Sequence, residues 1–260
     1  MPTFADACNA VLSEPGGDHS LYTTLAPIYE RLLVTAEARY DAQVLAVTER
    51  VPRSARVVLD AGCGVGRHLP ALADRHGAVV GLDASAELLS IAGSHVAASE
   101  GVSLVEGDVS DPTLDLQRRF DAAVSLDYLT ANLHGEALDR GFATLRRHLH
   151  DGGTLVVDAV ADRRALAEDS PSVFRDDRYV AERAVDVVDA GDATGDLVRV
   201  ADYRVTDNRT NEGAVARERE PIRTFDPAEL ADALDRAGFR EVRVEADVVE
   251  PGSLVATARV

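Results

Sequence analysis

The sequence contains no lysine and no tryptophan, and it has only two cysteines and one methionine. Two cysteines cannot build a disulfide framework and are too few for a cysteine-based zinc site, so we expect no metal. No apolar run approaches the roughly 20 residues that a membrane-spanning helix requires. The N-terminal residues lack the basic start and apolar core of a secretory signal. We therefore expect a cytoplasmic protein.

Positive charge is scarce: 27 basic residues, all arginine, face 45 acidic residues, and the net charge is -18. A surface this acidic repels phosphate backbones and anionic lipids, which argues against nucleic-acid and membrane partners. It is typical of halophilic proteins, because molar salt shortens the Debye length to about 3 Å and screens self-repulsion. The alternative is a codon bias that replaces lysine by arginine. That bias would not by itself create the acidity, so we favour a halophilic protein.

The length of 260 residues and the hydrophobic content of 46% allow one sizeable α/β domain with an elaboration. Between residues 57 and 160, short apolar runs alternate with helical patterns, which predicts a parallel sheet with right-handed crossovers. The expected strands are Val57–Asp60, Ala78–Asp83, Val102–Val105, Phe120–Leu126 and Thr154–Val160.

The segments on either side of this alternation have different patterns. Apolar residues recur at helical spacing from Leu21 to about Val51 and predict an N-terminal helical cap. Longer alternating runs at about 172–222, separated by turn residues, predict an inserted antiparallel β-meander. Two last strands, Glu241–Ala246 and Leu254–Val260, would complete the sheet. The expected organisation is an arm and cap over residues 1–52 and one domain over residues 53–260.

The run Val57–Gly66 reads as a buried strand that ends in an acid and then turns through three alternating glycines into a helix. Gly62, Gly64 and Gly66 lack the Cβ atoms that would keep a ligand away from the backbone. Ligands of open α/β sheets bind beyond the carboxyl ends of the strands, where this turn would lie. The run therefore predicts a ligand site.

Three carboxylates follow successive strands: Asp60, Asp83 and Asp108. All three would lie at the same edge of the sheet. Asp83 comes 17 residues after Gly66, near the spacing at which an acid binds ribose hydroxyls in dinucleotide folds. Asp60 suits an ammonium group better than a pyrophosphate, and Asp108 could accept a hydrogen bond from an adenine amino group. The edge therefore favours a cationic nucleoside.

Two other nucleotide motifs fit less well. The NAD fingerprint G-x-G-x-x-G needs a glycine where this sequence has Arg67. A P-loop requires a lysine, which the chain lacks. An NAD-linked oxidoreductase remains an alternative that the glycine spacing disfavours.

These motifs resemble, in order and spacing, those of class I S-adenosylmethionine (SAM)-dependent methyltransferases. Val57–Gly66 is similar to the first motif, Val80–Ser85 to the second, Glu106–Val109 to the third and Phe120–Ser125 to the fourth. The resemblance implies an α/β fold with a seven-stranded, mostly parallel Rossmann-like methyltransferase sheet, here with an N-terminal helical cap and an inserted β-meander. It also implies SAM as the cofactor.

The same resemblance implies a role for each matching residue. Asp83 would bind both ribose hydroxyls, with Ala84 near the adenine, and Asp108 would meet the adenine amino group beside Val109. The residues that would frame the methionine part of SAM are Asp60, Gly62, Cys63, Gly64 and Gly66. Ser125 and Leu126 would line the cofactor where its methyl group points.

The segment Ala26–Leu32 resembles one in the small-molecule N-methyltransferases, which include glycine and sugar-amine methyltransferases. There the tyrosine, Tyr29 in this chain, reaches over the cofactor; a tyrosine buried in the core is the alternative. Asp127 and Tyr128, just past the fourth strand, are the other candidate catalytic residues, with Asn132 and His134 behind them. For Asp127, an ordinary surface carboxylate is the competing interpretation.

We therefore expect a methyltransferase that acts on a small-molecule acceptor. N-methylation is favoured over O-methylation, since an amine needs only to be neutral whereas a hydroxyl needs a general base. A non-catalytic module that binds SAM or its product S-adenosylhomocysteine (SAH) is the second hypothesis. The sequence does not determine the oligomeric state.

If the acidity is an adaptation to high salt, the protein unfolds when salt is removed. We expect its thermal unfolding temperature to rise steeply with KCl concentration toward the molar range, because screening relieves the repulsion among surface carboxylates. Circular dichroism melts in dilute buffer and in molar KCl provide the measurement. Full stability in dilute buffer would favour the codon-bias explanation.

Overall fold

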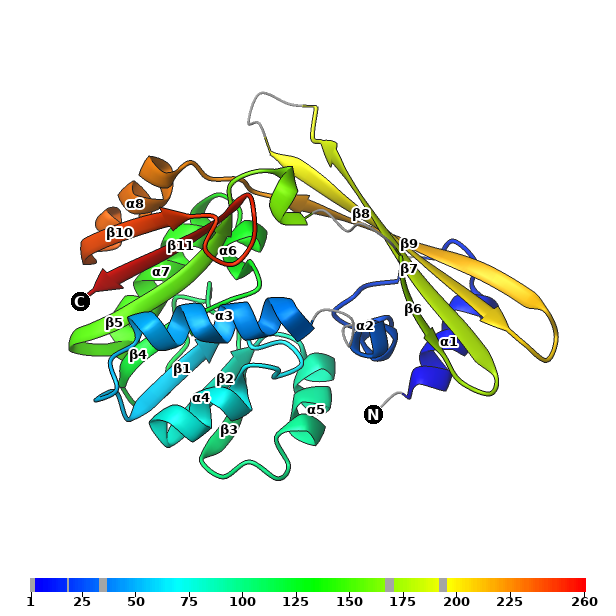
Figure 1. Cartoon of the computed structure of the whole chain (residues 1–260), viewed down its shortest axis with the longest axis horizontal. Helices are drawn as coiled ribbons and strands as arrows, with labels where there is room; N and C mark the ends of the chain where they lie inside the picture. The colour runs from blue at the N-terminus through cyan, green and yellow to red at the C-terminus, as the bar shows by residue number, and fades with distance from the viewer. Residues whose placement is uncertain (1–2, 18, 33–36, 167–170, 192–195) are drawn as a thin grey trace. The chain divides into compact units, whose positions relative to one another are not determined.

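The computed structural model describes residues 3–17, 19–32, 37–166, 171–191 and 196–260 (Figure 1). The chain divides into two compact units. Unit 1 comprises Met1–Glu37 and Leu166–Ile222, and unit 2 comprises Ala38–Ala165 and Arg223–Val260. The expected boundary between a cap and a methyltransferase domain at residues 52 and 53 stays a prediction, because compact units need not coincide with functional domains.

Unit 2 is built on a seven-stranded sheet with the order β10-β11-β5-β4-β1-β2-β3. Neighbours among β1 to β5 pair in parallel, and β11 pairs antiparallel with both β5 and β10. The strands are β1 (Val57–Ala61), β2 (Ala78–Asp83), β3 (Val102–Glu106), β4 (Phe120–Ser125), β5 (Leu149–Val160), β10 (Arg240–Ala246) and β11 (Ser253–Arg259). The predicted seven-stranded, mostly parallel sheet is confirmed.

The strand order reverses between β1 and β4. From β1 the chain adds β2 and β3 on one side, and β4 and β5 on the other. Asp60 of β1 lies opposite Val124 of β4 in the register, so both strands end at the same edge. Such a reversal leaves a crevice beyond the carboxyl ends of the two strands, where open α/β sheets bind their ligands.

Helices cover both faces of this sheet. The helices α7 (Glu136–His148) and α8 (Pro227–Arg236) pack on one face, and α3 (Glu37–Arg50) and α4 (Leu69–His76) pack on the other. Helix α5 (Ala86–His95) lies against β2 and β3, and the hydroxyl of Ser85 caps its N-terminus by accepting the N–H of Leu88 at 3.1 Å. Because both faces are covered, the strands are apolar on both sides.

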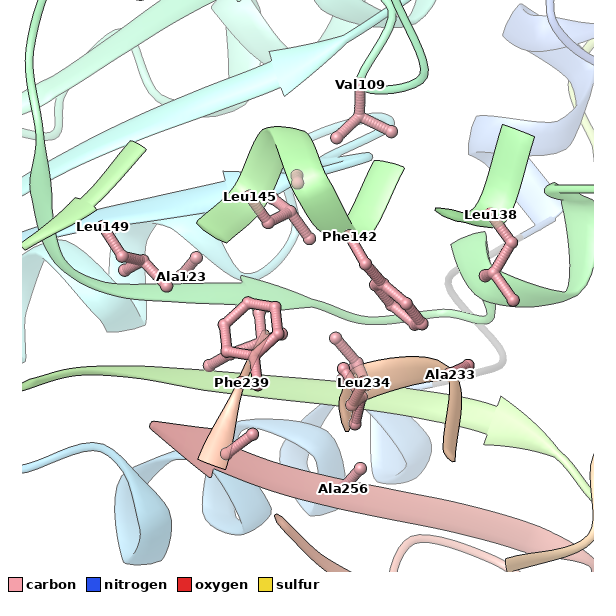
Figure 2. Packing of buried hydrophobic residues seen from close by; sticks show 14 of the residues in the cluster. Val109, Ala123, Leu138, Phe142, Leu145, Leu149, Ala233, Leu234, Phe239 and Ala256 are labelled. Carbon is pink, nitrogen blue, oxygen red and sulfur yellow. The ribbon is translucent and has the colours of Figure 1, made fainter. Parts of the chain in front are cut away.

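The core between α7, α8 and the sheet contains several large side chains. Figure 2 shows Phe142 pointing from α7 toward Leu234. Phe142 is 1% exposed, and Leu234 of α8 is fully buried in the same cluster. Helix α8 is fixed by a reciprocal cap, since Asp226 accepts the N–H of Glu229 at 2.8 Å and Glu229 accepts the N–H of Asp226 at 3.0 Å.

Unit 1 contains the antiparallel meander predicted from the sequence. Its four-stranded sheet has the order β6-β7-β8-β9. The helices α1 and α2 pack on one face of it through apolar side chains that include Phe4, Ile28 and Leu32. The elements are α1 (Phe4–Ser13), α2 (Ala26–Leu32), β6 (Ser172–Arg175), β7 (Tyr179–Asp189), β8 (Leu197–Asp207) and β9 (Glu212–Ile222).

The continuous helical pattern predicted for Leu21 to Val51 corresponds to α2 and α3, and residues 33–36 between them lie outside the described residues. Strand β6 was not predicted, and β5 begins five residues before the expected Thr154. Within the described ranges, no helix is long and apolar enough to cross a membrane.

Truncating Phe142 tests the core. We expect Phe142→Ala to lower the free energy of unfolding by about 3–5 kcal/mol, because it removes a buried ring and leaves a cavity. Leu45→Ala is the control, since Leu45 on α3 is 59% exposed and its truncation should cost less than about 0.5 kcal/mol. Urea unfolding at constant KCl measures both variants. If Phe142→Ala lowers the free energy of unfolding no more than Leu45→Ala does, the cluster around Phe142 does not stabilise unit 2.

Candidate active site

The glycine turn after β1 is tied to the end of β2. The N–H groups of Gly62 and Cys63 both donate to the carbonyl of Leu82, at 2.7 and 3.0 Å. Gly62, Gly64 and Gly66 have φ angles of 77°, 53° and 78°, in the left-handed region that favours glycine. These backbone angles give a second reason for glycine at the three positions, besides the close approach of a ligand that the sequence predicts.

The last two glycines of this turn serve different purposes. A Cβ on Gly66 would lie 2.9 Å from the Cβ of Ala92, so this glycine allows close packing against α5. A Cβ on Gly64 would meet no atom within 4 Å. Gly64 thus leaves space beside the backbone, as a site for a ligand requires.

Asp83 at the end of β2 holds the middle of the turn. Its Oδ2 accepts the N–H of Gly64 at 2.8 Å, and its Oδ1 accepts the N–H of Ser85 at 2.9 Å. Burial raises the pKa of this half-buried carboxyl, and the backbone N–H groups oppose the rise. The predicted ribose-binding acid therefore lies directly against the glycine turn.

Asp60 is a buried acid at the carboxyl end of β1. It is 1% exposed, and neither oxygen has a hydrogen-bond partner among the described residues. Burial, followed by the charges of Asp83 and Asp158, raises its pKa to about 7. An isolated buried carboxylate is costly, so a cationic ligand group placed here would relieve a large penalty.

Ser125, at the end of the neighbouring strand β4, is a second buried polar residue without a hydrogen-bond partner among the described residues. It is 1% exposed. Leu126, the next residue, is buried. Two unpartnered polar groups, from Asp60 and Ser125, thus lie at the ends of the strands that flank the crevice.

These observations fit SAM, which carries an ammonium group and ribose hydroxyls. Asp60 and the glycine turn would hold its methionine part, and Asp83 would accept from its ribose. The cofactor roles of the individual residues, including Ser125 and Leu126, stay predictions.

Other predicted cofactor residues lie around this edge. Cys63 is buried, and burial raises the pKa of its thiol, which keeps it protonated. Asp108 is exposed after β3 and accepts the N–H of Ser110 at 2.7 Å, and Val109 beside it is buried in the core. Ala84 is exposed. An adenine-binding role for Ala84, Asp108 and Val109 is not tested by these contacts.

The two candidate catalytic residues after β4 already have partners. Asp127 forms an ion pair with Arg39 of α3 at 2.8 Å, and Arg39 also pairs with Glu250 at 3.0 Å. The hydroxyl of Tyr128 donates to Glu250, and the guanidinium carbon of Arg39 lies 4.7 Å from the centroid of the Tyr128 ring. Burial raises the pKa of Tyr128, with Arg39 opposing the rise.

Sequence reasoning missed Arg39, Asp158 and Glu250. Asp158 is an acid inside the apolar run of β5, and an acid at a buried strand position was the one available signal. It is 1% exposed, and burial raises its pKa to about 7 although backbone N–H groups and Arg39 oppose the rise. Arg39 and Glu250 carried no signal, because exposed charged residues are common in this chain.

The third candidate catalytic residue, Tyr29, belongs to α2 of unit 1. The guanidinium carbon of Arg183 lies 5.6 Å from the centroid of its ring. A role of Tyr29 at the cofactor stays a prediction. Asn132 ends the short helix α6 (Leu129–Asn132), and His134 is exposed just beyond it.

Comparison with known proteins agrees with this geometry. Residues 58–153 match a family model described as "Methyltransferase domain". A dTDP-3-amino-3,6-dideoxy-alpha-D-glucopyranose N,N-dimethyltransferase of Streptomyces fradiae is 35% identical over 121 residues, which is 46% of this chain and 46% of that protein. The match thus spans about half the length of that relative.

Two solved structures match over most of both chains. The crystal structure of Streptomyces venezuelae DesVI is similar with a TM-score of 0.72 and 25% identity, covering 89% of this chain and 97% of that one. The sugar N-methyltransferase KedS8 from Streptoalloteichus sp ATCC 53650 gives a TM-score of 0.70 and 25% identity, covering 86% and 87%.

Residues 58–153 therefore match a methyltransferase domain, and unit 2 has the sheet of the class I SAM-dependent methyltransferase fold. The predicted family resemblance and fold class are confirmed.

The raised pKa of Asp60 predicts how stability depends on pH. An acid whose pKa is higher in the folded state than in the unfolded state loses stability as pH rises from about 4 through about 7. Asp60→Asn cannot ionise, so we expect it to be more stable than the wild type at pH 8 by about 1–4 kcal/mol and similar at pH 4.5. Urea unfolding at both pH values measures this difference.

Asp121→Asn is the control of opposite sign. The N–H groups of Arg56 and Val57 lower the pKa of Asp121, so this variant should lose stability at pH 8. The interpretation of Asp60 is wrong if Asp60→Asn changes stability equally at both pH values.

Proposed function

We propose that this chain is a SAM-dependent N-methyltransferase that acts on an amine of a small molecule, with amino sugars as the substrate class. The observation that carries the proposal is the carboxylate of Asp60, which has no hydrogen-bond partner in the described part of the chain and lies beside a glycine turn that leaves space for a ligand. It lies at the strand-order reversal of a methyltransferase fold. The relative from Streptomyces fradiae, named as a sugar N,N-dimethyltransferase, supports the substrate class.

When bound, SAM supplies an electrophilic methyl group on a sulfonium. The protein's contribution is then to align the acceptor with that methyl group and to exclude water, so positioning carries much of the rate. Asp60 would pair with the ammonium group, Asp83 would hold the ribose, and Ser125 and Leu126 would form the wall at the end of β4.

Contacts after β4 support nitrogen as the acceptor atom. Asp127 is paired with Arg39, so its carboxylate is already engaged by a cation. The raised pKa of Tyr128 makes its phenolate rare at neutral pH. A hydroxyl acceptor needs a base, whereas a neutral amine attacks without one. In this proposal Asp127 and Tyr128 line the place after β4 where the methyl group is transferred, and they do not abstract a proton.

The net charge of the chain supports proposals on the salt content of its cell and on its binding partners. With a net charge of -18, we infer a protein of a high-salt cell that does not bind nucleic acid or membranes. A cytoplasmic location, expected from the sequence, is part of the same proposal.

Cofactor binding tests the assignment of Asp83. We expect isothermal titration in high salt to show SAH binding, and Asp83→Ala to weaken it by about 1–3 kcal/mol, because hydrogen bonds to a charged acceptor are lost. Asp111→Ala removes an exposed acid after β3 and should change binding by less than about 0.5 kcal/mol. No SAH binding by the folded wild type would contradict the proposed function.

Methyl transfer tests the substrate class. We expect mass spectrometry to detect the addition of one or two methyl groups when the protein is incubated with SAM and nucleotide-linked amino sugars. Matched sugars that carry a hydroxyl in place of the amine should stay unmethylated. SAH binding without transfer to any acceptor of a broad amine panel would favour a non-catalytic binding module, and preferential transfer to hydroxyls would contradict N-methylation.

A further inference from the structure

The turn after β4 has an unusual backbone. Asp127 and Tyr128 have φ angles of 62° and 65°, the left-handed region that side chains with a Cβ disfavour. Two consecutive non-glycine residues in this region persist only where surrounding contacts hold them. The strain lies where β4 meets the crevice, so the contacts that oppose it bear on the site.

Asp158 of β5 makes these contacts. Its Oδ2 accepts the N–H of Asp127 at 2.9 Å, and its Oδ1 accepts the N–H of Tyr128 at 2.8 Å. Each of the two strained residues is therefore held by a different oxygen of the Asp158 carboxylate. Hydrogen bonds to a charged acceptor are stronger than neutral ones, and this acceptor is almost fully buried.

A buried polar chain fixes the orientation of this carboxylate. The side-chain amide of Gln43 on α3 donates to Oδ2 of Asp158 at 3.3 Å, and Nε2 of His68 lies 3.0 Å from Oε1 of Gln43. Gln43 is fully buried and His68 is 4% exposed. The hydroxyl of Thr130 donates to the backbone carbonyl of Asp158 at 2.7 Å, which also ties α6 to β5.

The turn after β4 contacts the glycine turn through Leu129. Leu129 follows Tyr128, and a Cβ on Gly62 would lie only 3.0 Å from Cδ2 of Leu129. The backbone conformation at Tyr128 therefore determines where Leu129 meets Gly62. The end of β4 and the glycine turn after β1 are thus coupled by contact.

We propose that Asp158 is a positioning residue. Its carboxylate holds Asp127 and Tyr128 in the left-handed conformation, so that the turn after β4 and the glycine turn form one wall of the methyl-transfer site. The kinetic consequence of this role rests on the proposed function. The structural role does not, because it concerns two backbone amides.

Backbone amide exchange tests the structural role in the full chain at high salt. In Asp158→Asn one acceptor oxygen becomes an amide that cannot accept, and in Asp158→Ala both acceptors are lost. We expect the amides of Asp127 and Tyr128 to exchange at least about tenfold faster in both variants, with the larger effect in Asp158→Ala. Should Asp158→Ala fail to fold, Asp158→Asn carries the test alone.

Asp121→Asn provides a matched control at the opposite end of β4. Oδ2 of Asp121 accepts the N–H groups of Arg56 and Val57, at 2.7 and 3.0 Å. This variant therefore also removes a carboxylate that accepts two backbone amides, but far along the strand from the crevice. We expect it to speed exchange at Arg56 and Val57 and to leave exchange at Asp127 and Tyr128 unchanged.

The catalytic consequence is tested by steady-state kinetics with an amine acceptor that the wild-type protein methylates. We expect kcat to fall about tenfold to a hundredfold in Asp158→Asn, because displaced groups misalign the reactants. The affinity for SAH should fall by a smaller factor. Asp121→Asn should keep kcat within about twofold, because Asp121 lies near the start of β4, at the end of the strand away from the crevice.

Several results would overturn the proposal. If the amides of Asp127 and Tyr128 exchange as slowly in Asp158→Asn as in the wild type, Asp158 does not hold the turn. An equal fall of kcat in Asp121→Asn would show a general loss of stability, not positioning. If the wild type methylates no amine, the proposed function fails, and the exchange data still decide whether Asp158 holds the turn.

Discussion

A carboxylate buried in a protein must be surrounded by donors or paired with a cation, and this constraint organises the candidate site. Asp60 and Asp158 are both 1% exposed near the same edge of the sheet, yet their surroundings are opposite. Asp158 is surrounded by protein donors and holds a strained turn, whereas Asp60 has no partner among the described residues. In the site that we propose, Asp158 holds the protein's own backbone and Asp60 would be available to a cationic group of the ligand.

Arginine has an important part in this arrangement because the chain is so acidic. Arg39 lies between Asp127 and Glu250 and over the ring of Tyr128. A planar guanidinium can contact two carboxylates and an aromatic ring at once, which a lysine ammonium does less well. The cation pairs with Asp127 after β4 and, through Glu250, connects α3 to the loop between β10 and β11.

The parallel sheet explains why these groups meet. Parallel strands end at one edge, so side chains far apart in the sequence, such as Asp60 and Asp158, come within electrostatic reach of each other. Glycines at Gly62, Gly64 and Gly66 then let the backbone turn closely beneath the crevice. The same architecture that buries the core therefore concentrates charge at one place, where it can serve binding.

Much of the fold and part of the site follow from the sequence by itself. The apolar strands, the glycine turn and the acids Asp60 and Asp83 are local patterns, in which spacing along the chain already implies a place at the sheet edge. The meander and the final strands were recognised for the same reason. What the chain could not reveal locally was β6, which is only four residues long, and the early start of β5.

Only the tertiary structure decided which partners the acids have. Asp158 looked like one acid in an apolar run, and its bonds to Asp127 and Tyr128 span about thirty positions of the chain. The ion pair of Arg39 with Asp127 spans still more. Hydrogen bonds and ion pairs of this kind depend on strand register and helix packing, which no local pattern encodes. The sequence by itself therefore predicted the edge of the sheet at which Asp60 and Asp83 lie, and the packing decided which acids near that edge already have partners within the described residues.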